Sequence, residues 1–297
     1  MRSDRNKPSS LTEYPFAPET FITAAGHRLS YVDEGKGPAV VMAHGNPSWS
    51  YLYRNLITAL WTEHRCIAPD HLGCGLSDKP QDWPYRLRGH IDNFTALLDQ
   101  LRIERCVLVV HDWGGAIGMG WAGQHPERVA GLVVLNTAAF PSKHLAWRIA
   151  VCRWPFLGAL LVRGLNGFAW PATFMAVQKT MRPEIKAAFL HPYDSWANRI
   201  AVHRFVQDIP MRPSHPSWDT LAEVEASLER LRHKPMLICW GGQDFCFNNH
   251  FYGEWRRRFP QAESCYFPAA GHYVLEDALP EVLKVLPGFV KKCHGLK

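Results

Sequence analysis

The stretch that most constrains the fold lies near the middle of the chain, at residues 106–123. Five apolar or β-branched residues, Cys106 to Val110, predict a buried parallel strand. A short polar turn follows, and a run of small residues from Gly114 predicts a helix directly after it. This order is typical of a nucleophile elbow, whose strained turn lifts one side chain above the edge of a sheet. Asp112 stands in that position, so the pattern predicts a carboxylate nucleophile.

One alternative to the elbow stays open at this point. Val110 stands two residues before Asp112, where the serine form of the elbow has glycine, so the serine motif itself is not matched. An ordinary β–α turn with Asp112 as the helix N-cap would give a similar local sequence. The rest of the chain must decide between the two interpretations.

The composition is that of an ordinary globular protein: of 297 residues, 47% are hydrophobic and 20% are charged. The net charge of +6 is scattered, and the one tight basic run, residues 256–258, predicts a solvated helix face and no nucleic-acid surface. Eight cysteines without a C-x-x-C pair predict reduced core residues in a cytoplasmic protein. The fifteen histidines show no metal-binding spacing, so we expect no metal and no other cofactor.

Targeting and membrane signals are weak. Residues 1–10 lack the hydrophobic region of a signal peptide. The longest apolar stretch of interest, Trp154 to Val162, is too short to span a bilayer. We interpret it as a helix of a cap, and peripheral association with a membrane surface stays open.

Eight short segments predict strands, and helical segments separate most of them. The expected strands are 21–24, 29–33, 38–43, 65–69, 106–110, 132–135, 236–240 and 264–267. The first two form a hairpin, and the alternation in the rest predicts a mostly parallel eight-stranded sheet covered on both faces. The fold class is therefore α/β, of the α/β-hydrolase kind.

The alternation stops between Phe140 and about Arg232, where no segment reads as a parallel strand. This segment is rich in Trp, Phe, Arg and Pro, and it is too long for a loop of a compact domain. We interpret it as an inserted helical cap. The expected domains are a first core part over 16–139, the cap over 140–232 and a second core part over 233–297.

Three chemically active residues follow three expected strands. Asp112, Asp244 and His272 each stand at the carboxyl end of a strand, where open α/β sheets place their sites. Their order along the chain, nucleophile, acid and histidine, is that of α/β-hydrolases. We therefore predict a catalytic triad of Asp112, His272 and Asp244, with the backbone N–H groups of Trp113 and Asn46 as donors to a developing anion. The side chains of Trp113 and Asn46 can donate into the same pocket.

Other carboxylates after strands are assigned structural roles. Asp70 and Asp78 are expected to stabilise a turn, because their position is not that of the acid. Glu276 and Asp277 are expected to favour the start of a helix rather than to orient His272. The segment 118–123 matches G-x-G-x-x-G, but it begins inside a helix and not at the end of a strand, so close packing of small residues explains it.

Two segments give the chain a family resemblance. Residues 44–47 (HGNP) and 111–115 (HDWGG) resemble the haloalkane dehalogenase family of α/β-hydrolases, and the likeness covers nearly the whole chain. The resemblance implies an aspartate that attacks carbon to form an ester, a histidine that activates water, and Trp and Asn side chains that hold the leaving halide. Some members place the acid after the strand before the cap, but this chain has Asn136 there, so Asp244 is the acid.

Longer segments resemble one group within that family. Residues 136–141, 192–200 and 271–277 are most similar to the β-lactone decarboxylases of long-chain olefin biosynthesis (OleB type). This resemblance implies conversion of cis-3-alkyl-4-alkyloxetan-2-ones to cis-alkenes and CO2, and partners among other olefin-biosynthesis enzymes such as a β-lactone synthetase. Attack by a carboxylate on the ring carbon that bears oxygen would release a carboxylate, much as attack on a haloalkane releases halide. Haloalkane dehalogenase activity is the alternative.

The cap supplies apolar side chains for a hydrophobic small-molecule substrate. The expected pocket residues are Trp147, Phe156, Phe168, Trp170 and Phe174. Each of them could equally pack within the cap itself.

Three other classes are weighed against these readings. Epoxide hydrolases usually have two cap tyrosines, and residues 140–232 contain only Tyr193; fluoroacetate dehalogenases usually have arginine where this chain has Trp113. A non-catalytic apolar-ligand-binding member would be expected to lack a member of the triad, and none is missing.

Overall fold

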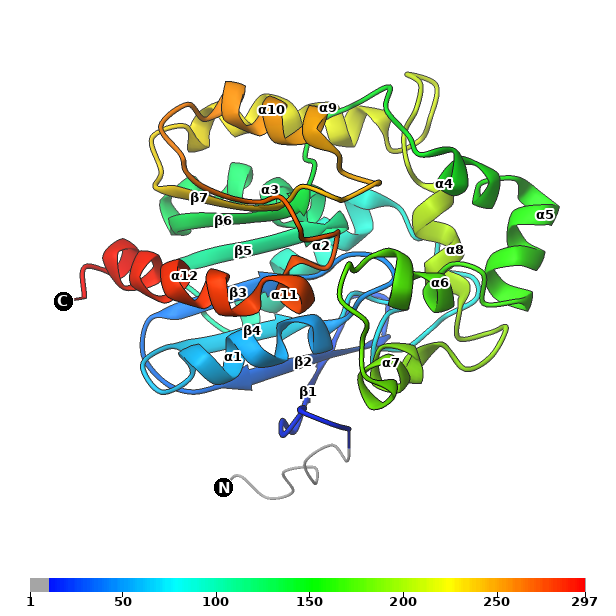
Figure 1. The fold of residues 1–297 in the computed structure, drawn as a ribbon, viewed down its shortest axis with the longest axis horizontal. Helices are drawn as coiled ribbons and strands as arrows, with labels where there is room; N and C mark the ends of the chain where they lie inside the picture. The colour runs from blue at the N-terminus through cyan, green and yellow to red at the C-terminus, as the bar shows by residue number, and fades with distance from the viewer. Residues whose placement is uncertain (1–10, 297) are drawn as a thin grey trace.

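The computed structural model describes residues 11–296, which form an eight-stranded sheet with helices on both faces (Figure 1). The strand order is β1-β2-β4-β3-β5-β6-β7-β8; β1 and β2 run antiparallel to their neighbours and the remaining pairs are parallel. The expected sheet is confirmed. The bounds are β1 Glu19–Ile22, β2 Arg28–Glu34, β3 Ala39–Ala43, β4 Arg65–Pro69, β5 Cys106–Asp112, β6 Val129–Thr137, β7 Met236–Gly241 and β8 Glu263–Phe267. Residues 1–10, where we expect no signal peptide, lie outside the described residues, as does Lys297.

Helices cover the sheet in two layers, as the parallel pattern requires. One layer packs on the cluster that contains Leu56 and Val282, and the other packs on the cluster that contains Ile91 and Ile117. The first layer comprises α1 Arg54–Leu60, α11 Val274–Asp277 and α12 Leu279–His294. The second comprises α2 Leu87–Gln100, α3 Trp113–Gln124, α9 Trp218–Ser227 and α10 Asn249–Arg258. Short turns are η1 Ser50–Tyr53, η2 Pro126–Arg128 and η5 Leu228–Leu231.

The central strands are buried along their whole length because both faces are covered. Every residue of β5 and of β6 is buried, which explains their continuous apolar sequences. A register shift between His111 and Asp112 ends the regular pairing of β5 with β6. The chain therefore leaves the sheet at the position where the sequence predicts the elbow.

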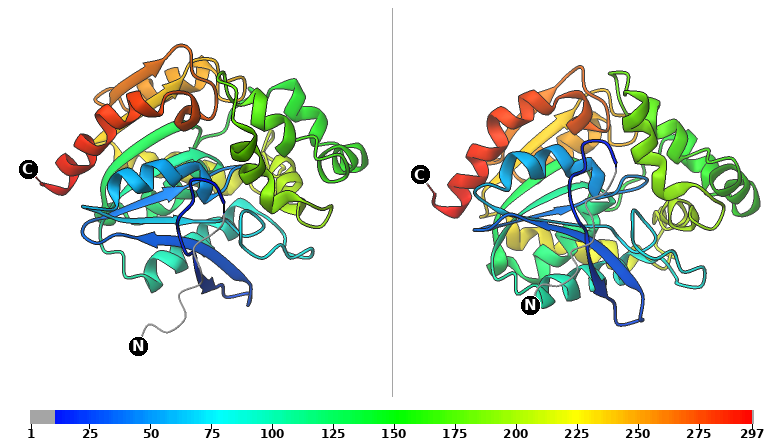
Figure 2. Two further views of the ribbon diagram at one scale, coloured as in Figure 1. Left: turned by 60° about the horizontal axis from the view of Figure 1, so that its bottom comes forward. Right: turned by 90° about the horizontal axis from the view of Figure 1, so that it is seen from below.

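The cap forms a separate lobe over one end of the sheet, visible in both views of Figure 2. It comprises α4 Trp147–Cys152, α5 Pro155–Ala159, the π-helical turn η3 Leu160–Gly164, α6 Ala169–Met175, α7 Pro183–Leu190, η4 His191–Tyr193 and α8 Ile200–Gln207. The expected end of the cap at residue 232 needs correction, because α9 packs against α2 and α3 in the layer on the sheet. The helical composition of 140–232 hid this boundary, since a cap helix and a core helix have the same sequence pattern.

The small residues of α3 serve close packing, as the analysis of 118–123 expects. A Cβ on Gly118 would lie 2.7 Å from Val110, one on Gly120 would lie 2.5 Å from Ile91, and one on Gly123 would lie 1.9 Å from Ser227. These approaches are shorter than real Cβ contacts, so glycine is required for α3 to sit against β5, α2 and α9.

Several minor expectations can be checked in the same structure. The basic run lies at the end of α10, where Arg257 pairs with Glu254 and Arg258 with Glu225, as expected for a solvated helix face. All eight cysteines are free, and Cys106 and Cys239 are buried in strands. Among the described helices, none has the length and apolar character needed to cross a bilayer.

Candidate active site

Asp112 occupies a strained turn between β5 and α3. Its φ of 52° and ψ of −126° are unfavourable for a residue with a side chain. Asp112 does stand at the N-cap position of α3, but it forms no side-chain capping hydrogen bond and its backbone is strained, so the turn is an elbow and not an ordinary β–α turn. The turn needs glycine around it: a Cβ on Gly114 would lie 1.9 Å from the carbonyl oxygen of Ala43, and one on Gly45 would lie 2.1 Å from Asp112 Oδ1. The elbow thus lifts the carboxylate above the sheet and packs the neighbouring turn directly against it.

The Asp112 carboxylate is buried among donors. The backbone N–H of Asn46 donates to Oδ1 at 2.6 Å, and the backbone N–H of Trp113 also donates to the carboxylate. The hydroxyl of Thr137, at the end of β6, donates to the carbonyl of Asp112 and fixes the strained backbone. Burial raises the pKa of Asp112, while His272 and the two N–H groups oppose that rise. The two predicted backbone donors therefore both contact the carboxylate that would react.

His272 lies between the two carboxylates of the predicted triad. Its Nδ1 is 2.7 Å from Oδ2 of Asp244, and its Nε2 is 3.7 Å from Oδ2 of Asp112. Nδ1–H donation to Asp244 leaves Nε2 as the nitrogen that faces the nucleophile. The structure therefore brings together the three residues that the sequence predicts, in the relation that nucleophile, base and acid require.

Asp244 is held by a dense set of hydrogen bonds at the end of β7. Its Oδ1 accepts from the backbone N–H groups of Cys246 at 2.7 Å and Phe247 at 3.1 Å. Its Oδ2 accepts from Nδ2 of Asn136 at 3.0 Å, in addition to the histidine. Because the carboxylate has partners on both oxygens, its orientation toward His272 is fixed.

Asn136 is a positioning residue that the sequence identified only as the place where an acid is absent. Its φ is 30°, and its Oδ1 accepts from the backbone N–H of Gly241 at 2.8 Å. Its Nδ2 donates both to Asp244 and to the carbonyl of Gly241. An amide can satisfy a donor and acceptors in this way, whereas a second carboxylate beside Asp244 could not.

The pKa of His272 is raised. Burial acts to lower it, but the charge of Asp244 and the hydrogen bond to that carboxylate, with a smaller contribution from Asp112, outweigh the burial. The ring of Phe247 stacks on the imidazole, with 5.8 Å between the ring centroids and 18° between the ring planes. The imidazole is therefore placed to hold or release a proton in a largely apolar site.

His111 is a second positioning residue, and sequence reasoning did not assign it a role. Its Nε2 lies 2.9 Å from the backbone carbonyl of His272. Burial lowers the pKa of His111 well below that of a free histidine, so the ring is neutral and donates to this carbonyl. The sequence indicates this role only through the position of His111 directly before Asp112. The end of β5 lies beside the loop after β8 that carries His272.

The side chains of Asn46 and Trp113, which are predicted to donate into the same pocket, have different surroundings. Nδ2 of Asn46 donates to the carbonyl of Val202 in α8 at 3.1 Å, and its Oδ1 is buried without a partner among the described residues. The ring of Trp113 packs 5.2 Å from that of Phe205 and borders the cavity. Both still border the space above Asp112, with one amide proton and the indole N–H available to an anion.

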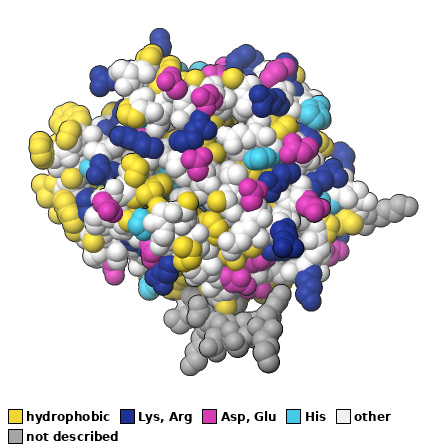
Figure 3. Space-filling model, turned by 180° about the vertical axis from the view of Figure 1, so that it is seen from behind, with side chains coloured by type: hydrophobic (Ala, Val, Ile, Leu, Met, Phe, Trp, Pro, Cys, Tyr) yellow, Lys and Arg dark blue, Asp and Glu magenta, His cyan; other side chains and the backbone are white. Residues whose placement is uncertain are grey.

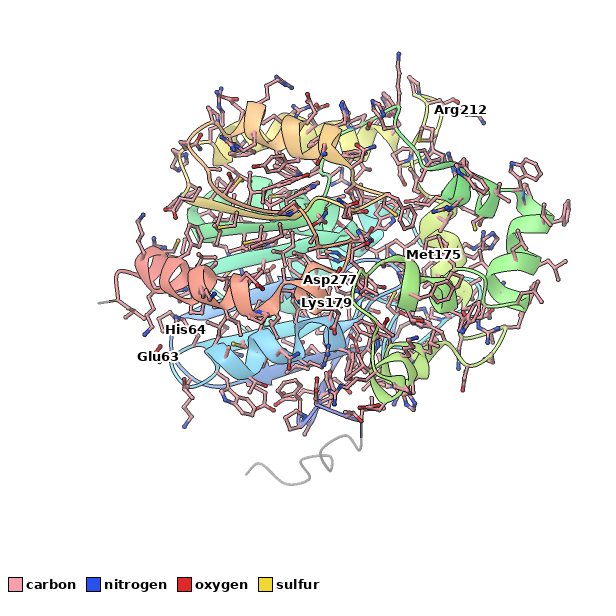
Figure 4. The ribbon with its side chains drawn as sticks, in the orientation of Figure 1. Glu63, His64, Met175, Lys179, Arg212 and Asp277 are labelled. Carbon is pink, nitrogen blue, oxygen red and sulfur yellow. The ribbon has the colours of Figure 1, made fainter. Side chains whose placement is uncertain are left out.

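A cavity of about 440 Å³ opens above Asp112, between the strand ends and the cap. Its floor contains Asp112, His272, Asn46 and Trp113. Its walls are mostly apolar and include Phe140, Ile149, Pro171, Met175 and Phe247. Met175 lies on the side of α6 that faces the sheet (Figure 4). An apolar cavity with a few polar groups at one end is typical of a site for a hydrophobic small molecule.

The structure corrects the predicted pocket residues. Trp147 and Phe168 border the cavity, but Phe156, Trp170 and Phe174 do not. Phe156 is 92% exposed, and the other two are also exposed on the outer side of the cap. Their neighbours on α6, Pro171 and Met175, line the cavity instead, because the opposite face of that helix points inward. An apolar sequence cannot distinguish the two faces of a helix that is apolar all round.

The remaining carboxylates are structural. Asp70 accepts from the backbone N–H groups of Ser50 and Leu76, and Asp78 accepts from the backbone N–H of Arg28, as expected for turns. Glu276 lies in the first turn of α11, as predicted, and it also forms a buried ion pair with Arg54 that the sequence did not indicate.

Asp277 links the cap to the histidine loop, a role that sequence reasoning missed. Its carboxylate accepts from the backbone N–H groups of Gln178 and Lys179, which follow α6, and of Gly271, which precedes His272. Figure 4 shows Lys179 beside Asp277 where the cap meets α11. The backbone N–H of Tyr273 also donates to the carbonyl of Ala176. Both neighbours of His272 are therefore tied, directly or through Asp277, to one segment of the cap.

No metal centre is evident in the structure. Within residues 11–296, no three His, Cys, Asp or Glu side chains are grouped so as to hold a metal ion. The site geometry rests on hydrogen bonds among the residues described above.

The chain belongs to the α/β-hydrolase family. The model of the α/β hydrolase fold matches residues 38–279. The solved structure of haloalkane dehalogenase DbeA from Bradyrhizobium elkani superimposes with a TM-score of 0.85, at 24% identity, over 94% of this chain and 99% of that one. At this identity the likeness shows the shared fold.

Within this family, the sequence is more similar to β-lactone decarboxylases than to haloalkane dehalogenases. The chain is 47% identical over 283 residues to the cis-3-alkyl-4-alkyloxetan-2-one decarboxylase of Shewanella oneidensis, covering 93% of this chain and 89% of that protein. It is 34% identical over 272 residues to haloalkane dehalogenase 2 of Mycobacterium bovis, covering 89% and 92%. The resemblance to β-lactone decarboxylases is thus confirmed, with the dehalogenases as more distant relatives.

Proposed function

We propose that this protein decarboxylates cis-3-alkyl-4-alkyloxetan-2-ones to cis-alkenes and CO2, with Asp112 as the nucleophile. The main support is the 47% identity to a decarboxylase of that name along nearly the whole chain. The geometry is consistent with it: a desolvated carboxylate faces an apolar cavity, and donors lie beside the position where a second carboxylate would form. Neither observation requires a cofactor.

The proposed first step is attack of an Asp112 oxygen on the ring carbon that bears the lactone oxygen. The new C–O bond forms as the ring C–O bond breaks, and the strained ring opens to an alkyl ester of Asp112 with a free carboxylate on the neighbouring carbon. The indole N–H of Trp113 and the side chain of Asn46 are the donors placed to receive that carboxylate. The step needs no proton and no water.

The second step releases CO2. The electron pair of the bond to the carboxylate forms the C=C bond, and the bond to Asp112 breaks, which regenerates the free carboxylate. Inversion in the first step and anti elimination in the second together preserve the relative placement of the two alkyl chains. A cis-lactone therefore gives a cis-alkene, as the proposal requires.

Haloalkane hydrolysis is the second candidate, and the His272–Asp112 geometry is the observation in its favour. Hydrolysis of an alkyl ester needs a base that activates water, and Nε2 of His272 at 3.7 Å from Asp112 is suitably placed. Decarboxylation consumes no water, so the two reactions make different demands on His272.

Side-by-side incubation with a long-chain cis-β-lactone and with 1-bromobutane tests the proposal. We expect alkene and CO2 from the lactone at a far higher kcat/KM than bromide release. Bromide release without alkene formation would overturn it in favour of dehalogenation. With haloalkanes, His272→Gln should accumulate a mass adduct on the peptide that contains Asp112; absence of the adduct would contradict the water-activating role.

The cellular setting is part of the proposal. The relatives' printed substrates are small and hydrophobic. We propose that this protein works in the cytoplasm beside other olefin-biosynthesis enzymes, such as a β-lactone synthetase, and that it touches membranes peripherally, since a dialkyl lactone partitions into lipid. Co-purification of the synthetase with this protein from the native cell would test the partnership.

A further inference from the structure

The outer surface of the cap is unusually apolar. Eight of the thirteen large hydrophobic side chains exposed by residues 11–296 lie between residues 147 and 174. We call this group the cap face; it includes Trp154, Phe156, Leu160, Trp170 and Phe174. Figure 3 shows hydrophobic side chains gathered at the edge of the molecule formed by the cap. A soluble monomer rarely exposes such a cluster without a partner for it.

The helices of the cap face present apolar residues on both sides. On α5 and η3, Phe156 and Leu160 point to solvent while Gly158 and Val162 are buried. On α6, Phe174 is exposed while Met175 borders the cavity. The outward residues do not contribute to the cavity, so the substrate site does not explain them.

The segment that carries the cap face has charge of one sign. The sequence has no Asp or Glu from residue 128 to residue 183, although this stretch contains Lys143, Arg148, Arg153 and Arg163. None of these four cations forms an ion pair with a carboxylate within residues 11–296. The guanidinium of Arg148 lies 5.5 Å from the ring of Trp147. Aromatic side chains next to basic ones are typical of proteins that bind at the interface of an anionic bilayer.

A groove beside the cap face extends this basic character. It is lined by Arg86, Arg153, Arg204 and Trp154. Arg86 is paired with Asp208, but Arg153 and Arg204 have no carboxylate partner in the described chain. Unpaired guanidinium groups next to an exposed indole suit the phosphate of a lipid headgroup above its acyl chains.

We infer that the cap face is a docking surface for the bilayer interface of membranes that contain anionic phospholipid. Trp147 belongs both to the cap face and to the border of the cavity, and it is 72% exposed. A docked cap therefore places the exposed border of the cavity at Trp147 against the lipid. This inference deepens the proposed function by adding a route for apolar substrate from the membrane, but the docking itself does not depend on which reaction the site performs.

Flotation with lipid vesicles tests the surface directly. We expect the full-length protein to float with phosphatidylcholine vesicles that contain a quarter phosphatidylglycerol, and to partition about tenfold less into pure phosphatidylcholine or at 0.5 M salt. Phe156→Ser/Leu160→Ser removes two outward side chains that do not border the cavity, and should lower partitioning about tenfold or more. Ile22→Ser is the control, because it also replaces an exposed apolar side chain by serine, but on β1 and not on the cap face. This variant should float like the wild type.

Three outcomes would overturn the inference. They are absence of the wild type from the vesicle fraction, equal flotation of the Phe156→Ser/Leu160→Ser variant, and loss of binding in the Ile22→Ser control. Light scattering without lipid tests whether the cap face instead binds a second copy of this chain. A wild-type dimer that the double variant abolishes would assign the cap face to that second copy and overturn membrane docking. Circular dichroism shows whether each variant is folded, and since no readout uses turnover, failure of docking is distinguishable from failure of the proposed reaction.

Discussion

The floor and the roof of the cavity are built on different principles. On the floor, Asp112, Asp244 and His272 come from the ends of three strands, and hydrogen bonds hold both oxygens of Asp244, Nδ1 of His272 and Oδ1 of Asp112. The roof consists of short helices whose apolar side chains face both the cavity and solvent. From this contrast we expect the core to set the chemistry and the cap to set which molecules reach it, so substitutions on the floor should cost more activity than substitutions on the roof.

The largest effect is expected from Asp112→Asn on the floor. Turnover of the lactone should fall about a thousandfold or more, because the amide cannot attack carbon. Burial raises the pKa of Asp112, so the ionised carboxylate lowers the stability of the folded protein at neutral pH. The protonated carboxyl contributes fully to the free energy of unfolding only below the pKa it has in the unfolded chain. That contribution is lost as the pH rises through the pKa in the folded protein. The variant should therefore unfold at an equal or higher temperature. A gain on the order of 1 kcal/mol is expected from thermal melts.

Asp219→Asn on the exposed side of α9 is the control for this variant, and it should change neither activity nor the melting temperature. Full activity in Asp112→Asn would contradict the division between floor and roof. A large loss of stability would instead show that the ionised carboxylate supports the fold.

Asp244→Asn should have the next largest effect. We expect kcat for 1-bromobutane hydrolysis to fall about a hundredfold, because that reaction needs the imidazole as a base and the imidazole loses the partner that fixes its tautomer. Lactone turnover, which consumes no water, should fall less. Asp244 is the main group that raises the pKa of His272, so its removal should lower that pKa. Any acid limb of the pH–rate profile due to protonation of His272 should consequently move to lower pH. A profile that keeps its shape and position would show that His272 does not titrate during turnover.

Phe168→Ala tests the inner side of the roof. Phe168 borders the cavity, so its truncation should raise KM about tenfold for a long-chain lactone while leaving kcat nearly unchanged. Phe156→Ala, on the outer side, is the paired control and should leave KM unchanged with substrate presented in solution. Equal effects of the two substitutions would remove the distinction between the two sides of the cap.

Asp277→Asn should give the smallest effect on activity, a few-fold decrease in kcat. The amide keeps one acceptor oxygen but cannot serve all three backbone N–H groups that the carboxylate receives. The segment that follows α6 should become more sensitive to limited proteolysis. Unchanged proteolysis together with unchanged kcat would mean that the link contributes to neither the cap nor the histidine.

The sequence predicts the floor better than the roof for a physical reason. Asp112, Asp244 and His272 follow buried strands, and parallel strands bring their carboxyl ends to one edge, so adjacency in space can be inferred from position in the chain. No such rule applies to short cap helices, and Phe156 and Phe174 were therefore assigned to the wrong side. Asn136 and His111 were missed as supports because their roles depend on hydrogen bonds to residues more than 100 positions away in the chain.

Both neighbours of His272, Gly271 and Tyr273, are attached to the segment after α6. This attachment limits how chimeric enzymes can be built from the cap of one α/β-hydrolase and the core of another. A donor cap transplanted as the unit from α4 to α8 would bring its own loop to Asp277, whose carboxylate accepts two backbone N–H groups from the cap and one from Gly271. If that loop differed in length, the imidazole would be displaced even though no floor residue had changed. Chimeras should therefore inherit residues 176–179 and 271–277 from the same parent.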